Sequence, residues 1–269
     1  SVSSPVKRIA FTATPDKRHD HADWMVEGMF GPVLLKIEYY DSVASGSILP
    51  LRLIMRDNPH GPTQETIRGI AKQATKDRLA LWRNPGRNAL IASDIRELMS
   101  KYPDPQTLIL VDKLEHALAL KEQLPEFEVA YGNIDAKKIA RLARRGIEIS
   151  EDDILSRKDR LEMLRRFESG ELKRVIATGI FSTGVSSNSC QIVGIATGCG
   201  SAIQLIQSMG RGSRKDESSG KTHATVIFWR DTSTDTYRNR AMRLHSVARK
   251  EGHDVDHIPA CGDLKSWTP

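Results

Sequence analysis

The sequence is poor in cysteine and has no long apolar run. Its three cysteines are far apart and odd in number, so we predict neither a disulfide framework nor a CxxC metal site; they are Cys190, Cys199 and Cys261. The eight histidines show no metal-ligand spacing, and we predict no metal site. No apolar stretch approaches the ~18–20 residues of a membrane-spanning helix, and no secretory pattern opens the sequence. We therefore expect a protein of the reducing cytoplasm without a membrane partner.

A complete phosphate-binding loop is also missing. Gly220-Lys221-Thr222 ends like a Walker A motif, but the full pattern needs glycine at position 215, where this sequence has Lys215. The motif also needs a helix after it, whereas a strand-like run follows here. We interpret the segment as a surface turn. The alternative, a self-sufficient P-loop enzyme, would depend on Lys221.

The charge balance is mildly positive. The 269 residues include 40 Lys and Arg against 34 Asp and Glu, which gives a formal charge of +6. Such a charge permits nucleic-acid binding but equally fits a well-solvated surface. With 39% hydrophobic and 28% charged residues, the composition is that of one large globular domain, or of one domain with a fragment of another.

From position 107 onward the sequence alternates apolar runs with amphipathic patterns. Strands are predicted over 107–111, 126–131, 174–178, 191–196 and 224–229, and helices over 113–124, 135–145, 157–169, 202–209 and 234–250. This alternation is typical of a parallel sheet with helices on both faces. Ligands of such sheets bind at the carboxyl ends of the strands, so we expect the chemistry in the loops after Val111, Tyr131, Thr178 and Ala196.

The N-terminal part is less regular. We predict a buried strand over 7–12, a helix over 20–29, strands over 33–40 and 48–55, and helices over 63–84 and 88–101. A central strand so near Ser1 has no partner before it, so we expect further sequence upstream. Residues 252–269 show no clear pattern.

The predicted helix over 135–145 is strongly basic. Its cations recur at one-, three- and four-residue steps and so gather on one side of the helix; they are Lys137, Lys138, Arg141, Arg144 and Arg145. Such a stripe can bind phosphates. A run of charge is more often a solvated face, and the acidic stretch from Glu148 to Asp153 partly cancels it.

Four segments, in this order, resemble the motifs of superfamily-two helicases. They are Phe11-Thr12-Ala13-Thr14-Pro15, the strand and helix from Thr107 to Leu124, the stretch from Ile176-Ala177-Thr178 through Phe181-Ser182-Thr183-Gly184-Val185-Ser186, and Gln207-Ser208-Met209-Gly210-Arg211-Gly212-Ser213-Arg214. The stretch from Arg160 to Gly170 also fits the Arg…Phe-x-x-Gly pattern of the family. The resemblance extends from Lys7 to Trp229, and its third segment is most similar to phage DNA helicases of the UvsW kind.

This resemblance implies a nucleotide site. Arg211 and Arg214 are three residues apart, so they share one side of a helical turn. Guanidinium groups placed in this way stabilise charge on a transferring phosphoryl group. By resemblance both are catalytic residues that contact the γ-phosphate of ATP, and Gln207, Gly210 and Gly184 line the nucleotide cleft. The simpler interpretation is a solvated basic turn.

The resemblance also implies contacts with a nucleic-acid strand. Short hydroxyl side chains and backbone N–H groups bind phosphates without reading bases, and by resemblance Thr178, Ser182, Thr183 and Gly132 do so here. Thr12 and Thr14 would couple two lobes of a motor. The family often has aspartate two residues after the glycine at 184, but this sequence has Ser186.

We therefore predict an α/β fold, the RecA-like three-layer parallel sheet of a helicase C-terminal lobe. Residues 1–31 would be the end of a first RecA-like lobe, 32–251 the second lobe and 252–269 a tail. ATP with Mg²⁺ would need the Walker motifs of a first lobe in the same or another chain, and the isolated chain would be inactive. The expected partner is branched or single-stranded DNA, in the host cytoplasm if the protein is encoded by a phage. The alternatives are a non-catalytic RecA-like module that binds nucleic acid or protein, and the lobe of an RNA helicase.

Overall fold

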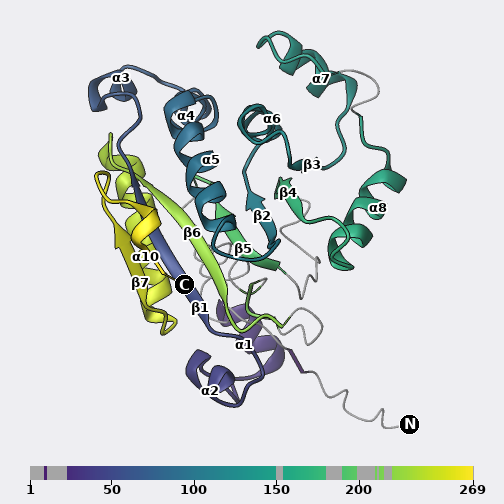
Figure 1. The fold of residues 1–269 in the computed structure, drawn as a ribbon, viewed down its shortest axis with the longest axis vertical. Helices are drawn as coiled ribbons and strands as arrows, with labels where there is room; N and C mark the ends of the chain where they lie inside the picture. The colour runs from purple at the N-terminus through teal and green to yellow at the C-terminus, as the bar shows by residue number, and fades with distance from the viewer. Residues whose placement is uncertain are drawn as a thin grey trace.

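The described part of the chain forms one parallel sheet of seven strands (Figure 1). The computed structural model describes residues 9–10, 23–149, 154–179, 190–198, 210, 212–214 and 220–268. The strands are β1 Leu51–Asn58, β2 Gln106–Leu110, β3 Glu128–Ala130, β4 Arg174–Ala177, β5 Cys190–Ile195, β6 Ala224–Asp231 and β7 Val255–Ile258. Their order is β3-β4-β2-β5-β6-β1-β7, and every neighbouring pair is parallel. This confirms the predicted α/β fold.

The sheet is buried on both faces because its strands carry apolar side chains on alternate sides. Ile54, Ile109 and Ile192 face a core that also contains residues of helices α5 (Pro85–Met99) and α6 (Leu114–Gln123). Leu53, Leu108 and Val193 face a second core with helices α8 (Arg157–Glu168) and α10 (Asp235–Lys250). Continuous apolar runs are what parallel strands need between two layers of helices.

Several helices match the sequence prediction closely. α10 buries Tyr237, Ala241, Leu244 and Ala248, which recur at helical spacing along one face. α8 ends before Gly170, whose φ of +75° suits a helix stop. Its N-terminus carries a capping box between Ser156 and Asp159. α7 (Ala136–Ala143) lies within the predicted basic helix, and the predicted helix over 202–209 lies outside the described residues.

Two predictions for the N-terminal part are wrong. The expected strand over 33–40 is absent: residues 32–38 have no regular structure, and helix α2 begins at Tyr39 and ends at Ala44. An apolar segment without a neighbouring strand cannot form a sheet. The expected helix over 63–84 is broken into α3 (Gln64–Arg68), α4 (Gln73–Asp77) and a π-helix (Arg78–Trp82). The first break follows Gly69, a poor helix former.

The beginning of the chain contains helix α1 (Asp23–Phe30). Residues 9 and 10, the described part of the strand expected over 7–12, have no regular structure. The rest of that prediction lies outside the described residues.

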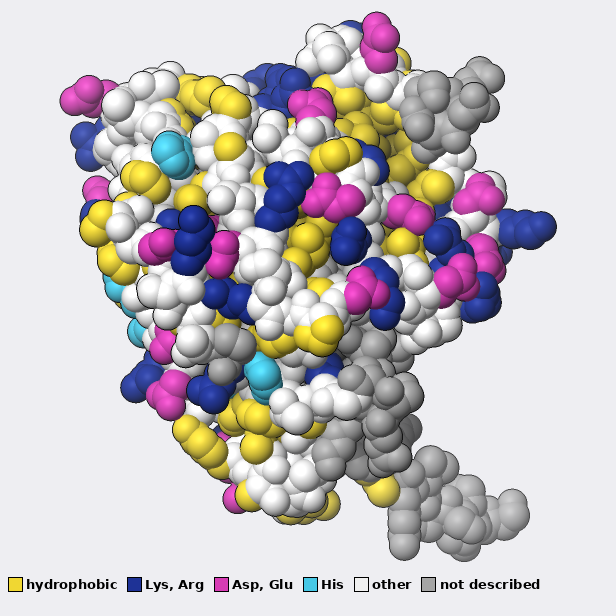
Figure 2. All heavy atoms as spheres, in the orientation of Figure 1, with side chains coloured by type: hydrophobic (Ala, Val, Ile, Leu, Met, Phe, Trp, Pro, Cys, Tyr) yellow, Lys and Arg dark blue, Asp and Glu magenta, His cyan; other side chains and the backbone are white. Residues whose placement is uncertain are grey.

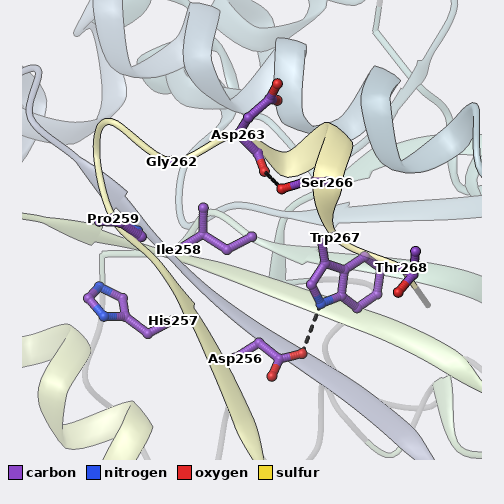
Figure 3. A pocket seen from close by; sticks show the side chains of 9 residues that line it. All are labelled: Asp256, His257, Ile258, Pro259, Gly262, Asp263, Ser266, Trp267 and Thr268. Carbon is purple, nitrogen blue, oxygen red and sulfur yellow. Dashed lines mark hydrogen bonds between the residues drawn. The ribbon is translucent and has the colours of Figure 1, made fainter.

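The C-terminal residues complete the sheet, which the sequence analysis did not predict. β7 pairs with β1, and Arg56 of β1 donates to the carbonyls of Pro259 and Gly262 at 2.7 and 2.8 Å. A short 3-10 helix (Leu264–Ser266) then brings Trp267 back against the core of α5 and α6. In Figure 3 the indole of Trp267 donates to Asp256 at 2.8 Å, beside an open hollow of about 490 Å³.

The described part of the chain lacks two features, a membrane-spanning helix and a cluster of metal-ligating side chains. None of its helices is long and apolar enough to cross a lipid bilayer. It also contains no group of three or more His, Cys, Asp or Glu side chains that could hold a metal ion.

Candidate nucleotide and nucleic-acid interface

Residues 212–214, which end in Arg214, lie at the amino ends of strands β1 and β6. Leu49 N, just before β1, donates to Ser213 O at 2.6 Å, and Ser213 Oγ donates to Gly210 O at 3.1 Å. A Cβ on Gly212 would lie 3.0 Å from the Cβ of Ala224, the first residue of β6, so only glycine fits this close approach without a shift. The Arg214 side chain is exposed just beyond these contacts.

Lys221 holds the backbone of Arg214 through a hydrogen bond from its buried side chain. Its ammonium donates to Cys190 O at 2.7 Å and to Arg214 O at 3.2 Å, and the side chain is buried. β6 begins three residues later, where a phosphate-binding loop would need a helix. Lys221 therefore stabilises the arginine segment, and its geometry does not support a self-sufficient P-loop.

Gly132 and Thr178 lie at the opposite edge of the sheet. Thr178 directly follows β4, and its backbone N–H donates to Ala130 O, the last residue of β3, at 2.9 Å. Gly132 comes two residues after β3, and no atom would lie within 4 Å of a Cβ added there. The pairing of β3 with β4 thus brings these two predicted residues together at the carboxyl edge.

The remaining predicted site residues lie outside the described part of the chain. They are Arg211, Gln207, Gly184, Ser182, Thr183, Thr12 and Thr14. Those that are described fall into two groups, Gly132 with Thr178 and Gly210 with Arg214. Strands of four to six residues separate the groups, which is roughly 13–20 Å at about 3.3 Å per residue.

The alternation of strands and helices predicted chemistry at the carboxyl edge, and the sheet topology explains why Arg214 lies at the amino edge instead. β5 and β6 are parallel neighbours, so the chain between them must return from the carboxyl to the amino edge. The final residues of that connection, including Arg214, therefore reach β6 at its amino end.

The carboxyl edge also holds polar residues that the sequence analysis missed. Asp112 follows β2, and its carboxylate accepts a hydrogen bond from Gly198 N at 3.0 Å. Burial raises the pKa of this carboxyl, against the opposing effect of that hydrogen bond and of nearby Lys113 and Arg87. The sequence could have indicated Asp112, because it directly follows the apolar run predicted as a strand over 107–111.

A second polar group at this edge had no sequence signal. Arg240 of α10 donates both to Gly198 O and to Asp77 Oδ1 at 3.1 Å, and Tyr237 also donates to Asp77 at 2.9 Å. These partners are widely separated in the sequence. Arg240 and Asp112 together satisfy both backbone polar groups of Gly198, three residues after the end of β5.

A buried ion pair lies beneath this edge. The Arg87 side chain is fully buried, and its Nε donates to Asp231 Oδ1 at 2.7 Å. Asn58 donates to the same oxygen at 2.7 Å, and a second Arg87 nitrogen donates to Ala196 O at 3.2 Å. The network joins the ends of β1, β5 and β6 to the first turn of α5.

Comparison with known proteins agrees with this fold. Residues 90–216 match the family described as the helicase conserved C-terminal domain, a range that includes Gly132, Thr178, Gly210 and Arg214. Residues 90–216 thus form a helicase C-terminal domain, and the parallel α/β sheet described above agrees with that match. A comparison with curated proteins finds no match.

Solved structures with a similar fold include three much longer chains. A fragment assigned as the HsdR subunit of a type I restriction enzyme from Vibrio vulnificus YJ016 has a TM-score of 0.59 and 18% identity, over 90% of this chain and 42% of that one. Dbp5 of S. cerevisiae bound to RNA and ADP BeF3 has a TM-score of 0.53 and 12% identity, over 90% and 49%. LlaBIII, an ATP-dependent Type ISP restriction-modification enzyme bound to DNA, has a TM-score of 0.52 and 11% identity, over 90% and 18%.

At these identities the likeness concerns the fold alone. The chain spans less than half the length of each of these three proteins. The resemblance to UvsW-type helicases stays a prediction.

Proposed function

We propose that this chain is the second motor lobe of an ATP-dependent DNA helicase or translocase. It presents arginines to ATP at one edge of its sheet and binds the backbone of a DNA strand at the other. The observation that carries the proposal is the separation of the two predicted groups of residues to opposite edges within one helicase C-terminal domain. Hydrolysis and strand contact can then be coupled through one rigid sheet.

The amino edge suits a contact with nucleotide held by another lobe. Arg214 is exposed there, and its backbone is held by buried Lys221. By the family resemblance Arg211, three residues earlier in the sequence, would contact the γ-phosphate together with Arg214, and Gln207, Gly210 and Gly184 would line the nucleotide cleft. A fixed guanidinium can stabilise the charge that develops on a transferring phosphoryl group without reorganising.

The same edge carries apolar surface suited to contact with the remainder of a first lobe. Leu51 N, at the start of β1, donates to the Tyr39 hydroxyl at 2.8 Å, so α2 lies at this edge. Trp24 and Met29 of α1, and Leu34 after it, are 71%, 57% and 92% exposed. Figure 2 shows apolar side chains around α1 and α2 at the lower end of the view. Exposed apolar patches of this kind mark interaction sites.

We assign the segments on this basis. Residues 1–31 belong to the end of a first lobe, with Thr12 and Thr14 coupling the two lobes. Residues 32–251 form the second lobe, and the segment 252–269 adds strand β7 to its sheet. ATP and Mg²⁺ bind to the Walker motifs of the first lobe, so this chain needs that lobe for hydrolysis.

The carboxyl edge suits a nucleic-acid backbone. Thr178 offers a hydroxyl and Gly132 leaves open space beside it, and Ser182 and Thr183 extend the hydroxyl-rich segment. Such groups bind phosphates without reading bases. We favour DNA because two similar folds belong to restriction enzymes, one of them bound to DNA. The RNA-bound Dbp5 supports the alternative, the lobe of an RNA helicase.

The test is ATP hydrolysis with single-stranded DNA, measured for this chain alone and for its mixture with an ATP-binding first lobe from the same genome. We expect activity only in the mixture. Hydrolysis by this chain alone would contradict the proposal. DNA binding without hydrolysis in the mixture would instead show a non-catalytic RecA-like binding module.

A further inference from the structure

The helix α7 carries cations for which the proposed contacts at Thr178 and Gly132 give no role. Lys137, Lys138, Arg141 and Arg144 are exposed, and no described residue forms an ion pair with any of them. At about 100° per residue these four lie within an arc of roughly 120° around the helix axis. The positive charge is therefore concentrated on one face.

The opposite side of α7 is firmly attached to the protein. Leu142 is buried and Ile139 packs against the core of α5 and α6. The Asp135 side chain caps the helix by accepting from Lys138 N at 2.7 Å. Beyond the last turn, Arg145 pairs at 3.1 Å with Glu115, a buried carboxylate that also accepts from Arg78. The basic face is thus held outward by apolar packing, a cap and a buried ion pair.

The position of α7 relates it to the predicted strand contact. It begins four residues after Gly132, at the carboxyl edge of β3, and Figure 1 shows it beyond β3 at that end of the sheet. Thr178 is joined to the end of β3 by its hydrogen bond to Ala130. A strand that contacts Thr178 and continues past β3 therefore meets α7.

The spacing of the cations fits a phosphate backbone. Lys137, Arg141 and Arg144 are seven positions apart from first to last, which is about 10 Å of helix at 1.5 Å per residue. In a duplex one DNA strand places a phosphate about every 3.4 Å along the axis, so a row of this length can lie against more than one phosphate. Three cations of one row can therefore neutralise neighbouring phosphates at the same time.

We propose that α7 is a backbone clamp, which holds the sugar-phosphate chain of the nucleic-acid strand as it leaves the contacts at Thr178 and Gly132. The clamp reads no bases, because lysine and arginine on phosphates add affinity and salt dependence without sequence preference. This inference rests on the proposed function, since it presumes a nucleic-acid strand at the carboxyl edge.

The test compares two charge-matched variants of the full chain. The clamp variant is Lys137→Gln/Lys138→Gln/Arg141→Gln/Arg144→Gln. The control is Arg238→Gln/Arg243→Gln/Arg249→Gln/Lys250→Gln, which removes four exposed cations from α10, across the sheet. Both lower the formal charge of +6 by four. Circular dichroism and thermal melting first establish that both variants are folded.

The measurement is the dissociation constant for a fluorescent single-stranded oligonucleotide of about 20 nucleotides, between about 50 and 200 mM KCl. We expect the clamp variant to bind about tenfold or more weakly at the lowest salt. Its slope of log affinity against log salt should be shallower by about 0.7 for each phosphate that the variant no longer neutralises. The control should keep nearly the wild-type slope.

The outcomes distinguish failure of the α7 clamp from failure of the proposed helicase function. Wild-type binding with the same slope in the clamp variant would overturn the clamp and leave the proposed function standing. Equal weakening of both variants would also overturn it, because net charge alone would then explain the effect. Absence of binding by the wild-type chain would overturn the clamp together with the proposed DNA contact.

Discussion

The helices α7 and α8 follow one another in the chain and both are basic, but their charges have different surroundings. In α8, Arg165 pairs with Glu162 at 2.7 Å and with Glu171 at 3.2 Å, and Arg166 pairs with Glu128 and Glu171. Figure 2 shows cationic and acidic side chains intermingled in this region. In α7 no described acidic residue pairs with the four exposed cations.

The α8 arginines are thus already neutralised by glutamates, whereas the four α7 cations are available to an anionic ligand as far as the described residues are concerned. The glutamates raise the pKa of Arg165 and Arg166 above its usual value through hydrogen bonds and direct attraction. A phosphate would have to displace those carboxylates, whereas no carboxylate of the described residues would have to leave the four cations of α7. The number of basic residues alone does not distinguish the two helices; their partners do.

The largest expected effect comes from the most deeply buried pair, Arg87 and Asp231. Replacing Asp231 with alanine leaves the Arg87 guanidinium buried without its carboxylate. We expect the free energy of unfolding to fall by about 3–5 kcal/mol, measured by urea denaturation. The double variant Arg87→Met/Asp231→Leu should recover much of that loss. A loss below about 1 kcal/mol in Asp231→Ala would show that this pair behaves like the exposed ones.

Besides the paired and the unpaired basic residues, a third class consists of histidines whose pKa is lowered by burial in the folded protein. Burial lowers the pKa of His253 to about 4, and it lowers the pKa of His116 well below its usual value. The unfolded chain binds protons at about pH 6.5, so between there and pH 4 it holds more protons than the folded protein. Stability should therefore fall as the pH drops through this window, by on the order of 3 kcal/mol for His253.

The matched variant is His253→Phe, which keeps a ring against Tyr39 but cannot titrate. Urea midpoints from about pH 7 to 4 should then fall less steeply than in the wild type, with His116 contributing the remaining slope. Identical profiles for the two proteins would contradict the assignment.

Glu115 belongs to a buried ion pair and also supports the helix with the unpaired cations, because it pairs with Arg145 just after α7. We expect Glu115→Ala to lower the free energy of unfolding by about 1–3 kcal/mol, since it removes hydrogen bonds to two guanidinium groups. Hydrogen exchange of the α7 amides should become faster while exchange in β2 and β5 stays slow. Unchanged exchange in α7 would mean that its apolar contacts hold it without Glu115.

The smallest effect is expected on α8. Arg165→Gln removes exposed pairs that water and salt already screen, so the thermal midpoint should not change measurably. The salt slope of DNA binding should also equal that of the wild type. A shallower slope would place phosphate contacts on α8 and remove the distinction between the helices.

Periodicity predicted the regular elements well. The buried face of α10 followed from four apolar residues at helical spacing, and β2, β4, β5 and β6 followed from continuous apolar runs. β7 was missed because Val255–Ile258 is short and half polar, and it is a strand only because β1 offers a parallel edge. The strand predicted over 33–40 was wrong for the opposite reason, since its apolar composition predicted a strand where the described part of the chain offers no partner strand.

The site was predictable in its residue types and less so in its arrangement. The motifs selected Thr178 and Arg214, but their placement at opposite edges depends on where the β5–β6 connection ends. The role of Lys221 as a support for Arg214 required the folded structure, because its partners are backbone carbonyls that no motif records. The contact of Arg240 with Asp77 joins residues 163 positions apart and left no local signal.

The most direct test of the two-edge arrangement is a DNA titration of ATP hydrolysis, with the Arg214→Ala chain assembled with an ATP-binding first lobe. We expect the maximal rate to fall about a thousandfold, as for loss of an arginine finger. The DNA concentration at half-maximal rate should stay unchanged, because the proposed strand contacts, at Thr178 and Gly132, lie at the other edge. An unchanged maximal rate would contradict the arrangement, and so would an effect confined to the DNA concentration that the reaction requires.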